Sequence, residues 1–324
     1  MCVLLVIVSS MSDLRETPGP GRRSRLTAGT IAAAVAACLG AAGCSAASSG
    51  SQQGNHHVAG TPSNGTSSAS PLATVASPDP LGPPADPFSG TPADHWADGA
   101  AGIVLPAARP VGPFTTSQVE SAYQTTRKML IAADLDKQTL FGGAPTAFAD
   151  LLTNSDRTWF LDGLNLKGTD KSGAPLSTRT YVVSFAPGST QLIGSVIKVH
   201  GTIHAQAATD DGSPVLAVYV DYLFTYAAEP PHHPEDWMRL VSEAAWIVSF
   251  GDWQGAATSF EPSFSTHGDD GVSGNSCGNK DGFVHPDWPS NREAEPSASA
   301  SGTSINPYAL GQSKSATCQG TTGT

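Results

Sequence analysis

The sequence predicts an α+β domain, in which N-terminal helices pack on one face of an antiparallel meander of four strands. Between residues 117 and 152, apolar side chains recur at the spacing of helices. From Arg179 onward they alternate with polar side chains, as in half-buried strands. Long strands that follow paired helices are typical of a layered fold in which helices cover one face of a sheet.

A capping box marks the start of the first helix. Ser117 is the expected N-cap residue, and Glu120 follows three residues later. Apolar side chains then continue at helical spacing to about Asp134, where the helix is expected to end. A second helix is predicted over residues 144–152, because Pro145 is tolerated in a first helical turn.

Four strands are expected in the second half of the domain, at residues 179–186, 194–208, 214–227 and 237–250. The sequence Asp210-Asp211-Gly212 supplies a tight turn between the second and the third. In the second strand, His200 and His204 share the polar face. Four residues of strand separate them by roughly 13 Å, too far for two ligands of one zinc ion.

The N-terminal region has the layout of a secretory leader. Arginines at positions 22, 23 and 25 precede an apolar run from Leu26 to Leu39, and small residues lead to Cys44. This layout resembles bacterial lipoprotein signal peptides, and with the Ala/Gly/Pro-rich composition it resembles actinobacterial lipoproteins. Because the apolar patch at residues 1–10 precedes the arginines, translation is expected to start at Met11.

The resemblance implies that a cysteine thiol carries a lipid, including palmitate, and becomes the first mature residue. At Cys44 the preceding Ala41 departs from the leucine preferred in the lipobox, whereas Val35 before Cys38 fits that position better. The small polar residues after Cys44 form a better tether, so Cys44 is the predicted lipidation site and Cys38 its rival. The arginine pair also loosely resembles a twin-arginine signal, and Sec export fits equally well.

Composition divides the rest of the chain. We predict a signal peptide at residues 1–43, a lipid anchor and flexible linker at 44–97, one α+β domain at 98–253, and a Gly/Ser-rich C-terminal tail at 254–324. The chain has 17 Lys and Arg against 28 Asp and Glu, without a basic stripe, which argues against a nucleic-acid partner.

Two further cysteines lie in the predicted tail. If Cys44 carries a lipid, Cys277 and Cys318 remain as an even pair outside the leader. In an oxidising compartment they are expected to form a disulfide. The alternative is that both are unpaired thiols.

The order of two helices and a meander of long strands resembles the NTF2-like fold, with cystatin-like domains as an architectural neighbour. The resemblance implies a curved sheet around a helix and a conical pocket. Isomerases and cyclases of this fold use an aspartate base and a tyrosine donor in that pocket. Asp221 and Tyr219 share a strand face and are the catalytic candidates that match; the alternative is that they are cross-strand packing residues.

Histidines and carboxylates cluster in the sequence His232-His233-Pro234-Glu235-Asp236. The cluster lies between two predicted strands and lacks the His-x-x-x-His spacing of helical zinc sites. An exposed loop explains its polarity, so no metal site is predicted. If the loop did bind a metal ion, His232 and His233 would be the candidate ligands. The sequence also lacks a nucleophile elbow, a phosphate loop, a dinucleotide fingerprint and a Cys-x-x-Cys pair, and no cofactor is expected.

These features favour a non-enzymatic lipoprotein on the extracytoplasmic face of the cell membrane, held there by its N-terminal lipid. Its domain is expected to bind another envelope component, either a protein or a cell-wall polymer. The alternative function is a small-ligand binder or an enzyme of isomerase or cyclase type with an NTF2-like pocket.

Overall fold

A computed structural model describes residues 82–171, 173–252, 260–266, 271–276, 278–292 and 306–311. All of them belong to one unit of the chain, Leu72–Thr324. Within these ranges, no helix has the length and apolar character needed to cross a bilayer. The fold class is α+β, as predicted: helices between residues 116 and 163 pack against an antiparallel meander.

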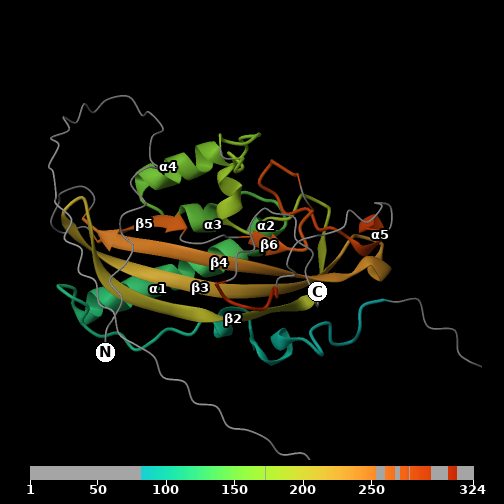
Figure 1. Ribbon diagram of the computed structural model, residues 1–324, viewed down its shortest axis with the longest axis horizontal. Coiled ribbons are helices and arrows are strands. Elements are labelled where there is room, and N and C mark those ends of the chain that lie inside the picture. The colour runs from blue at the N-terminus through green and yellow to red at the C-terminus, as the bar shows by residue number, and fades with distance from the viewer. Residues whose placement is uncertain are drawn as a thin grey trace, which may run out of the picture. The chain divides into compact units, whose positions relative to one another are not determined.

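The meander contains five strands in the order β1-β2-β3-β4-β5, and every neighbouring pair is antiparallel. Their bounds are β1 Ala97–Asp98, β2 Gln191–Asp210, β3 Ser213–Glu229, β4 Met238–Gly251 and β5 Glu261–Thr266. A sixth strand, β6 (Gly271–Ser273), also pairs with β4. Figure 1 shows the three long strands β2, β3 and β4 side by side.

The predicted turn between β2 and β3 is confirmed. Asp210 pairs with Ser213 across the two-residue loop. Asp211 and Gly212 both have positive φ angles, 46° and 80°, as the primed hairpin turns require. Three of the four predicted strands correspond to β2, β3 and β4.

The strand predicted at residues 179–186 is wrong. This stretch begins in a short 3₁₀ helix, η3 (Thr178–Tyr181), and continues as irregular extended chain. Its backbone hydrogen bonds go to separate partners: Val183 N–H donates to Ala133 and Phe185 N–H donates to Leu140. The alternating apolar residues therefore reflect packing on several elements rather than one ladder.

The sheet takes β5 and β6 from the part of the chain predicted to be a Gly/Ser-rich tail, so the fold continues beyond residue 253. Composition underestimated this region because a short strand needs few large side chains. In β5 a single ring, that of Phe264, makes three aromatic contacts, with centroid distances from 4.9 to 5.7 Å. Its partners are Phe148, Tyr181 and Trp246.

The first helix, α1 (Thr116–Asp134), has the predicted end but a different cap. Thr115 is the N-cap residue, and its capping partner is Gln118 rather than the predicted pair Ser117 and Glu120. Thr115 Oγ1 accepts from Gln118 N–H, and the Gln118 side chain accepts from Thr115 N–H. The same Ser/Thr-x-x-Glu/Gln pattern occurs twice here, and the earlier copy is used.

The remaining helices are short. The second predicted helix is only one turn, α3 (Thr146–Ala149), preceded by Pro145. Two helices were not predicted, α2 (Lys137–Leu140) and α4 (Asn154–Gly163). The short elements outside this layer are η1 (Pro92–His95), η2 (Gly99–Gly102), η4 (Pro234–Asp236) and α5 (Pro289–Arg292). In Figure 1, α3 lies closer to the sheet than α4.

Each face of the sheet has its own apolar cluster. The larger cluster lies on the helix side and includes the β3 residues Leu216, Val218, Val220, Tyr222, Phe224 and Tyr226. The smaller cluster involves the alternate β3 residues Leu223 and Ala227, which point to the other face. Phe88 and Ala93 from the chain before β1, and Tyr308 from the chain after α5, cover this second cluster.

Candidate functional site

Asp221 and Tyr219 lie on the sheet face that points away from the helices, because their neighbours Val220 and Tyr222 belong to the helix-side cluster. Both side chains are half-buried. The Tyr219 ring stacks on His204, with centroids 5.1 Å apart and planes 9° apart. Its hydroxyl accepts a hydrogen bond of 2.8 Å from Gln206 Nε2. The two predicted catalytic candidates therefore share a face, but that face is not the one inside the helical layer.

β2 presents a row of exposed polar side chains on this same face. Four alternate residues form the row, and all are exposed: His200, Thr202, His204 and Gln206. His200 stacks on Trp96, with centroids 5.2 Å apart. Thr202 pairs with Asp221 across the strands, and His204 pairs with Tyr219. The structure thus agrees with the expectation that His200 and His204 share a polar face, and we call these four residues the β2 polar row.

On the helix side, the tyrosines of β3 are built into the core. The Tyr226 hydroxyl donates to the backbone oxygen of Asp134 at 2.9 Å, and the ring meets Phe185 edge-on. Burial raises the pKa of Tyr226 well above its ordinary value, and the Asp134 carboxylate adds to that rise. The Tyr222 hydroxyl donates to Val104 at 3.2 Å, and burial raises its pKa as well. These phenols are held as neutral hydrogen-bond donors within an apolar interior.

The histidine loop between β3 and β4 is open to solvent. His233 Nδ1 lies 3.1 Å from Glu235 Oε1, and both side chains are more than half exposed. The backbone N–H of Glu235 and the His233 ring lower the pKa of that carboxyl. His232 precedes them with a positive φ of 69°. In the described part of the chain, no three His, Cys, Asp or Glu side chains gather to hold a metal ion.

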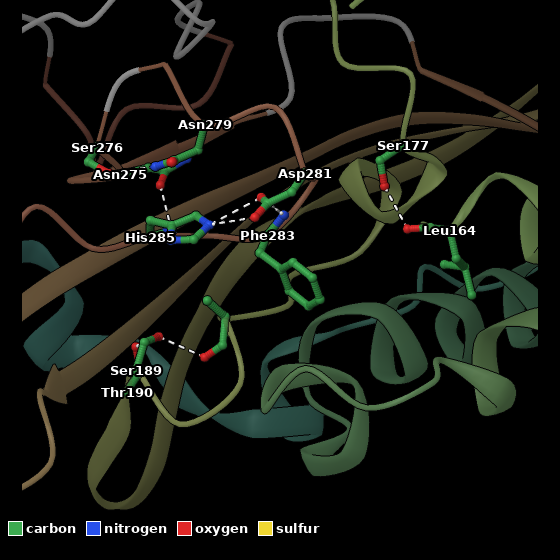
Figure 2. A network of polar contacts seen from close by, with 11 residues as sticks. Leu164, Ser177, Ser189, Thr190, Asn275, Ser276, Asn279, Asp281, Phe283 and His285 are labelled. Carbon is green, nitrogen blue, oxygen red and sulfur yellow. Dashed lines mark hydrogen bonds and ion pairs between the residues drawn. The ribbon is translucent and has the colours of Figure 1, made fainter. Parts of the chain in front are cut away.

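A polar network that the sequence did not indicate joins the chain after β6 to η3. Figure 2 shows His285 between Asn275 and Asp281. His285 Nε2 lies 3.1 Å from each carboxylate oxygen of Asp281, and Asn275 Oδ1 accepts from the His285 backbone N–H at 2.8 Å. Burial pushes the pKa of Asp281 upward, but hydrogen bonds from Phe283 N–H and His285 outweigh burial and lower it overall.

Arg179 of η3 is the buried cation of this network. It is 4% exposed, and one guanidinium nitrogen donates to the Gly143 carbonyl and to Ser184 Oγ. Its guanidinium carbon lies 4.3 Å from the centre of the Phe283 ring. Burial lowers the pKa of Arg179, while the negative charge of Asp281 acts in the opposite sense. Chemically, the network orients one imidazole and brings residues 278–288 into contact with η3.

Four predicted site residues lie outside the described part of the chain. These are the lipidation candidates Cys44 and Cys38 and the predicted disulfide partners Cys277 and Cys318. Lipidation and the disulfide therefore stay predictions. The sequence signal that could have identified Asp281 and His285 in advance is faint. They are four residues apart, in a segment whose composition suggested a tail.

Comparison with known proteins gives no relative for this chain: no protein family, no curated protein and no solved structure matches it.

Proposed function

We propose that the protein is an extracytoplasmic lipoprotein, anchored in the cell membrane through a lipid on Cys44. Its α+β domain is a non-enzymatic module that binds another component of the envelope. The leader supports the address, because a basic start, an apolar run and small residues before a cysteine favour export and lipidation. A linker of Ser, Gly, Ala and Pro after Cys44 supports a domain held at a distance from the membrane.

The observation that carries the binding role is the division of the sheet into two unlike faces. The helix-side face is filled by buried side chains such as Tyr222 and Trp246 of the sheet and Phe148 of α3. The other face carries the β2 polar row, whose side chains are exposed and carry hydrogen-bonding groups. Contact across an exposed strand face therefore fits the structure better than chemistry in an interior pocket.

The alternative, a small-ligand binder or NTF2-like pocket enzyme, has less support. It would use Asp221 and Tyr219 inside the space between the sheet and the helices, but both side chains point to the opposite face. The tyrosines of β3 that do point inward, Tyr222 and Tyr226, donate to the backbone oxygens of Val104 and Asp134 and are fully buried.

Metabolic labelling with a palmitate analogue, combined with detergent-phase partitioning, tests the address. The Cys44→Ala variant is expected to lose both the label and the membrane partitioning, and Cys38→Ala is expected to keep both. Unchanged labelling of Cys44→Ala, or loss of labelling in Cys38→Ala alone, would reject Cys44 as the anchor.

Co-sedimentation of the mature chain with purified cell-wall sacculi, and separately with detergent-solubilised envelope proteins on beads, tests the module. A Thr202→Ala/His204→Ala/Gln206→Ala variant is expected to lose binding to one of the two preparations. Ser155→Ala/Thr158→Ala is the matched control, because these two exposed polar residues lie on α4, outside the sheet. If both variants lose binding equally, or if the unmutated chain binds neither preparation, the β2 polar row is rejected as the contact surface.

A further inference from the structure

A short segment, residues 306–311, covers part of the sheet face that points away from the helices. The side chain of Tyr308 is buried in the smaller apolar cluster, and half-buried Leu310 packs against that cluster. The ring of Tyr308 meets Trp96 edge-on, with centroids 5.8 Å apart. The sheet residues of the cluster are Leu223, Ala227 and Val241. Two side chains of the segment therefore reach an apolar surface that the sheet provides.

A buried carboxylate of β4 holds the end of this segment. Glu243 is 3% exposed, and its Oε1 accepts a hydrogen bond of 2.7 Å from the backbone N–H of Gly311. Its cross-strand partner on β3 is Leu223 of the apolar cluster. Burying a carboxylate costs free energy, and a well-packed apolar side chain often serves stability equally well. Glu243 therefore fits a role in recognising a backbone N–H at one fixed position.

Residues 306–311 form a turn through bonds of their own. Asn306 Oδ1 accepts from the backbone N–H of Tyr308 at 3.0 Å, and the Asn306 carbonyl accepts from Ala309 N–H at 3.2 Å. Asparagine followed by proline favours such a turn, because the side chain can bond the backbone two residues on. Since these bonds lie within the segment, a short peptide of the same sequence can form them. A peptide that is already close to its bound shape loses less entropy on binding.

We propose that this part of the sheet is a binding site for a short peptide, and that residues 306–311 are the ligand it holds within the same chain. The site recognises an Asn-Pro turn, a tyrosine and a leucine two residues apart, and the backbone N–H that follows the leucine. A segment of another protein with these features binds in place of residues 306–311. The inference does not rest on the lipid anchor or on the β2 polar row.

Fluorescence anisotropy with a labelled peptide of residues 304–313 tests the proposal on the unlipidated mature chain. In the wild type the site is filled from within the chain, which competes with the peptide. The variant Tyr308→Ala/Leu310→Ala removes both apolar contacts of the resident segment. It is expected to bind the peptide at least about tenfold more tightly than the wild type, the factor for a site that is empty in one molecule of ten.

A second variant, Gly311→Pro, releases the segment without changing the apolar side chains of the site. Proline has no N–H to donate to Glu243, and its ring cannot adopt the φ of 69° found at Gly311. Gly311→Pro is expected to raise the peptide affinity by a smaller factor. It also supplies the answer if Tyr308→Ala/Leu310→Ala does not fold.

Two controls test the recognition itself. Glu243→Gln, added to the Tyr308→Ala/Leu310→Ala chain, should weaken peptide binding by about fivefold, because a charge-assisted hydrogen bond becomes a neutral one. Glu261→Gln is the matched change on β5 and should leave binding unaltered. A peptide of scrambled sequence should bind neither variant. The proposal is overturned if neither emptied chain gains affinity, if the scrambled peptide gains equally, or if the two glutamate variants weaken binding to the same extent.

Discussion

Along β3, neighbouring residues meet two different environments. Tyr222, Phe224 and Tyr226 enter the large helix-side cluster, where they are fully buried. Tyr219 and Asp221 point to the other face, opposite the β2 polar row. The comparison teaches that one face of this sheet buries most of its apolar side chains. The other face keeps a row of polar side chains exposed to solvent.

The second face is itself divided. Around Leu223 and Ala227 it is covered by Phe88, Ala93 and Tyr308, which come from opposite ends of the described chain. This smaller cluster is apolar, whereas the β2 polar row is not. Packing on this face therefore depends on segments that lie outside the helices and the long strands.

The largest loss of stability is expected from Phe148→Ala, on the helix side of the sheet. Phe148 is fully buried and contacts Phe160, Trp246 and Phe264. Its removal should leave a cavity and lower the free energy of unfolding by about 3–5 kcal/mol, measured by urea denaturation. Phe141→Ala is the control, since Phe141 is 38% exposed and should cost much less. Equal losses in the two variants would contradict a dominant helix-side core.

Sequence periodicity predicted the elements whose side chains have one consistent environment. β3 and β4 were found because they are buried along most of their length, and α1 because it keeps one buried stripe. β2 was found from fewer side chains, since its buried residues are Ile197, Val199 and Ile203. The strand expected at 179–186 failed because its apolar residues pack on several elements. β5 was missed because its sequence, Glu-Pro-Ser-Phe-Ser-Thr, contains one large apolar side chain.

A second difference concerns alkaline pH and the buried phenol of Tyr226. Because its pKa is raised in the folded state, the unfolded chain releases this proton first, starting near pH 10. The contribution of Tyr226 to stability is therefore complete below about pH 10 and is lost as pH rises above that value. Tyr226→Phe should flatten this alkaline loss.

At pH 7, the free energy of unfolding of the same Tyr226→Phe variant should be lower by roughly 1–3 kcal/mol, because the Asp134 carbonyl oxygen loses its hydrogen-bond donor. Urea denaturation at several pH values from 7 to 11 measures both effects. An equally steep alkaline loss in the variant would show that other groups cause it.

The candidate sites were predictable only in part, for a related reason. Strand alternation correctly placed Asp221 with Tyr219, and His200 with His204, but alternation does not say which face the helices cover. The Arg179, Asp281 and His285 network was not predictable, because its members come from an irregular segment and a loop that meet only in the folded chain. No local pattern links them.

The next test concerns the N-cap of α1, the first helix of the helical layer. Thr115→Ala should lower the free energy of unfolding by about 1 kcal/mol, because the variant loses the Oγ1 that accepts from Gln118 N–H. Ser117→Ala is the matched control and should have little effect, since Ser117 is inside the helix and not its cap. A larger loss in Ser117→Ala would restore the cap expected from the Ser117 and Glu120 pattern.

The smallest effects should come from one substitution made on both sides of the sheet. Thr126 of α1 is fully buried on the helix side, and its hydroxyl has no hydrogen-bond partner among the described residues. Thr126→Val removes a polar group from an apolar site and should stabilise the fold by roughly 0.5–1 kcal/mol.

Thr202 lies in the exposed β2 polar row, so Thr202→Val keeps the branched shape favoured in strands and should change stability by less than about 0.5 kcal/mol. Thermal denaturation of both variants measures the contrast. A clear loss in Thr126→Val would mean that the helix-side interior holds a partner for that hydroxyl. A clear loss in Thr202→Val would mean that the polar row contributes to the fold as well as facing solvent.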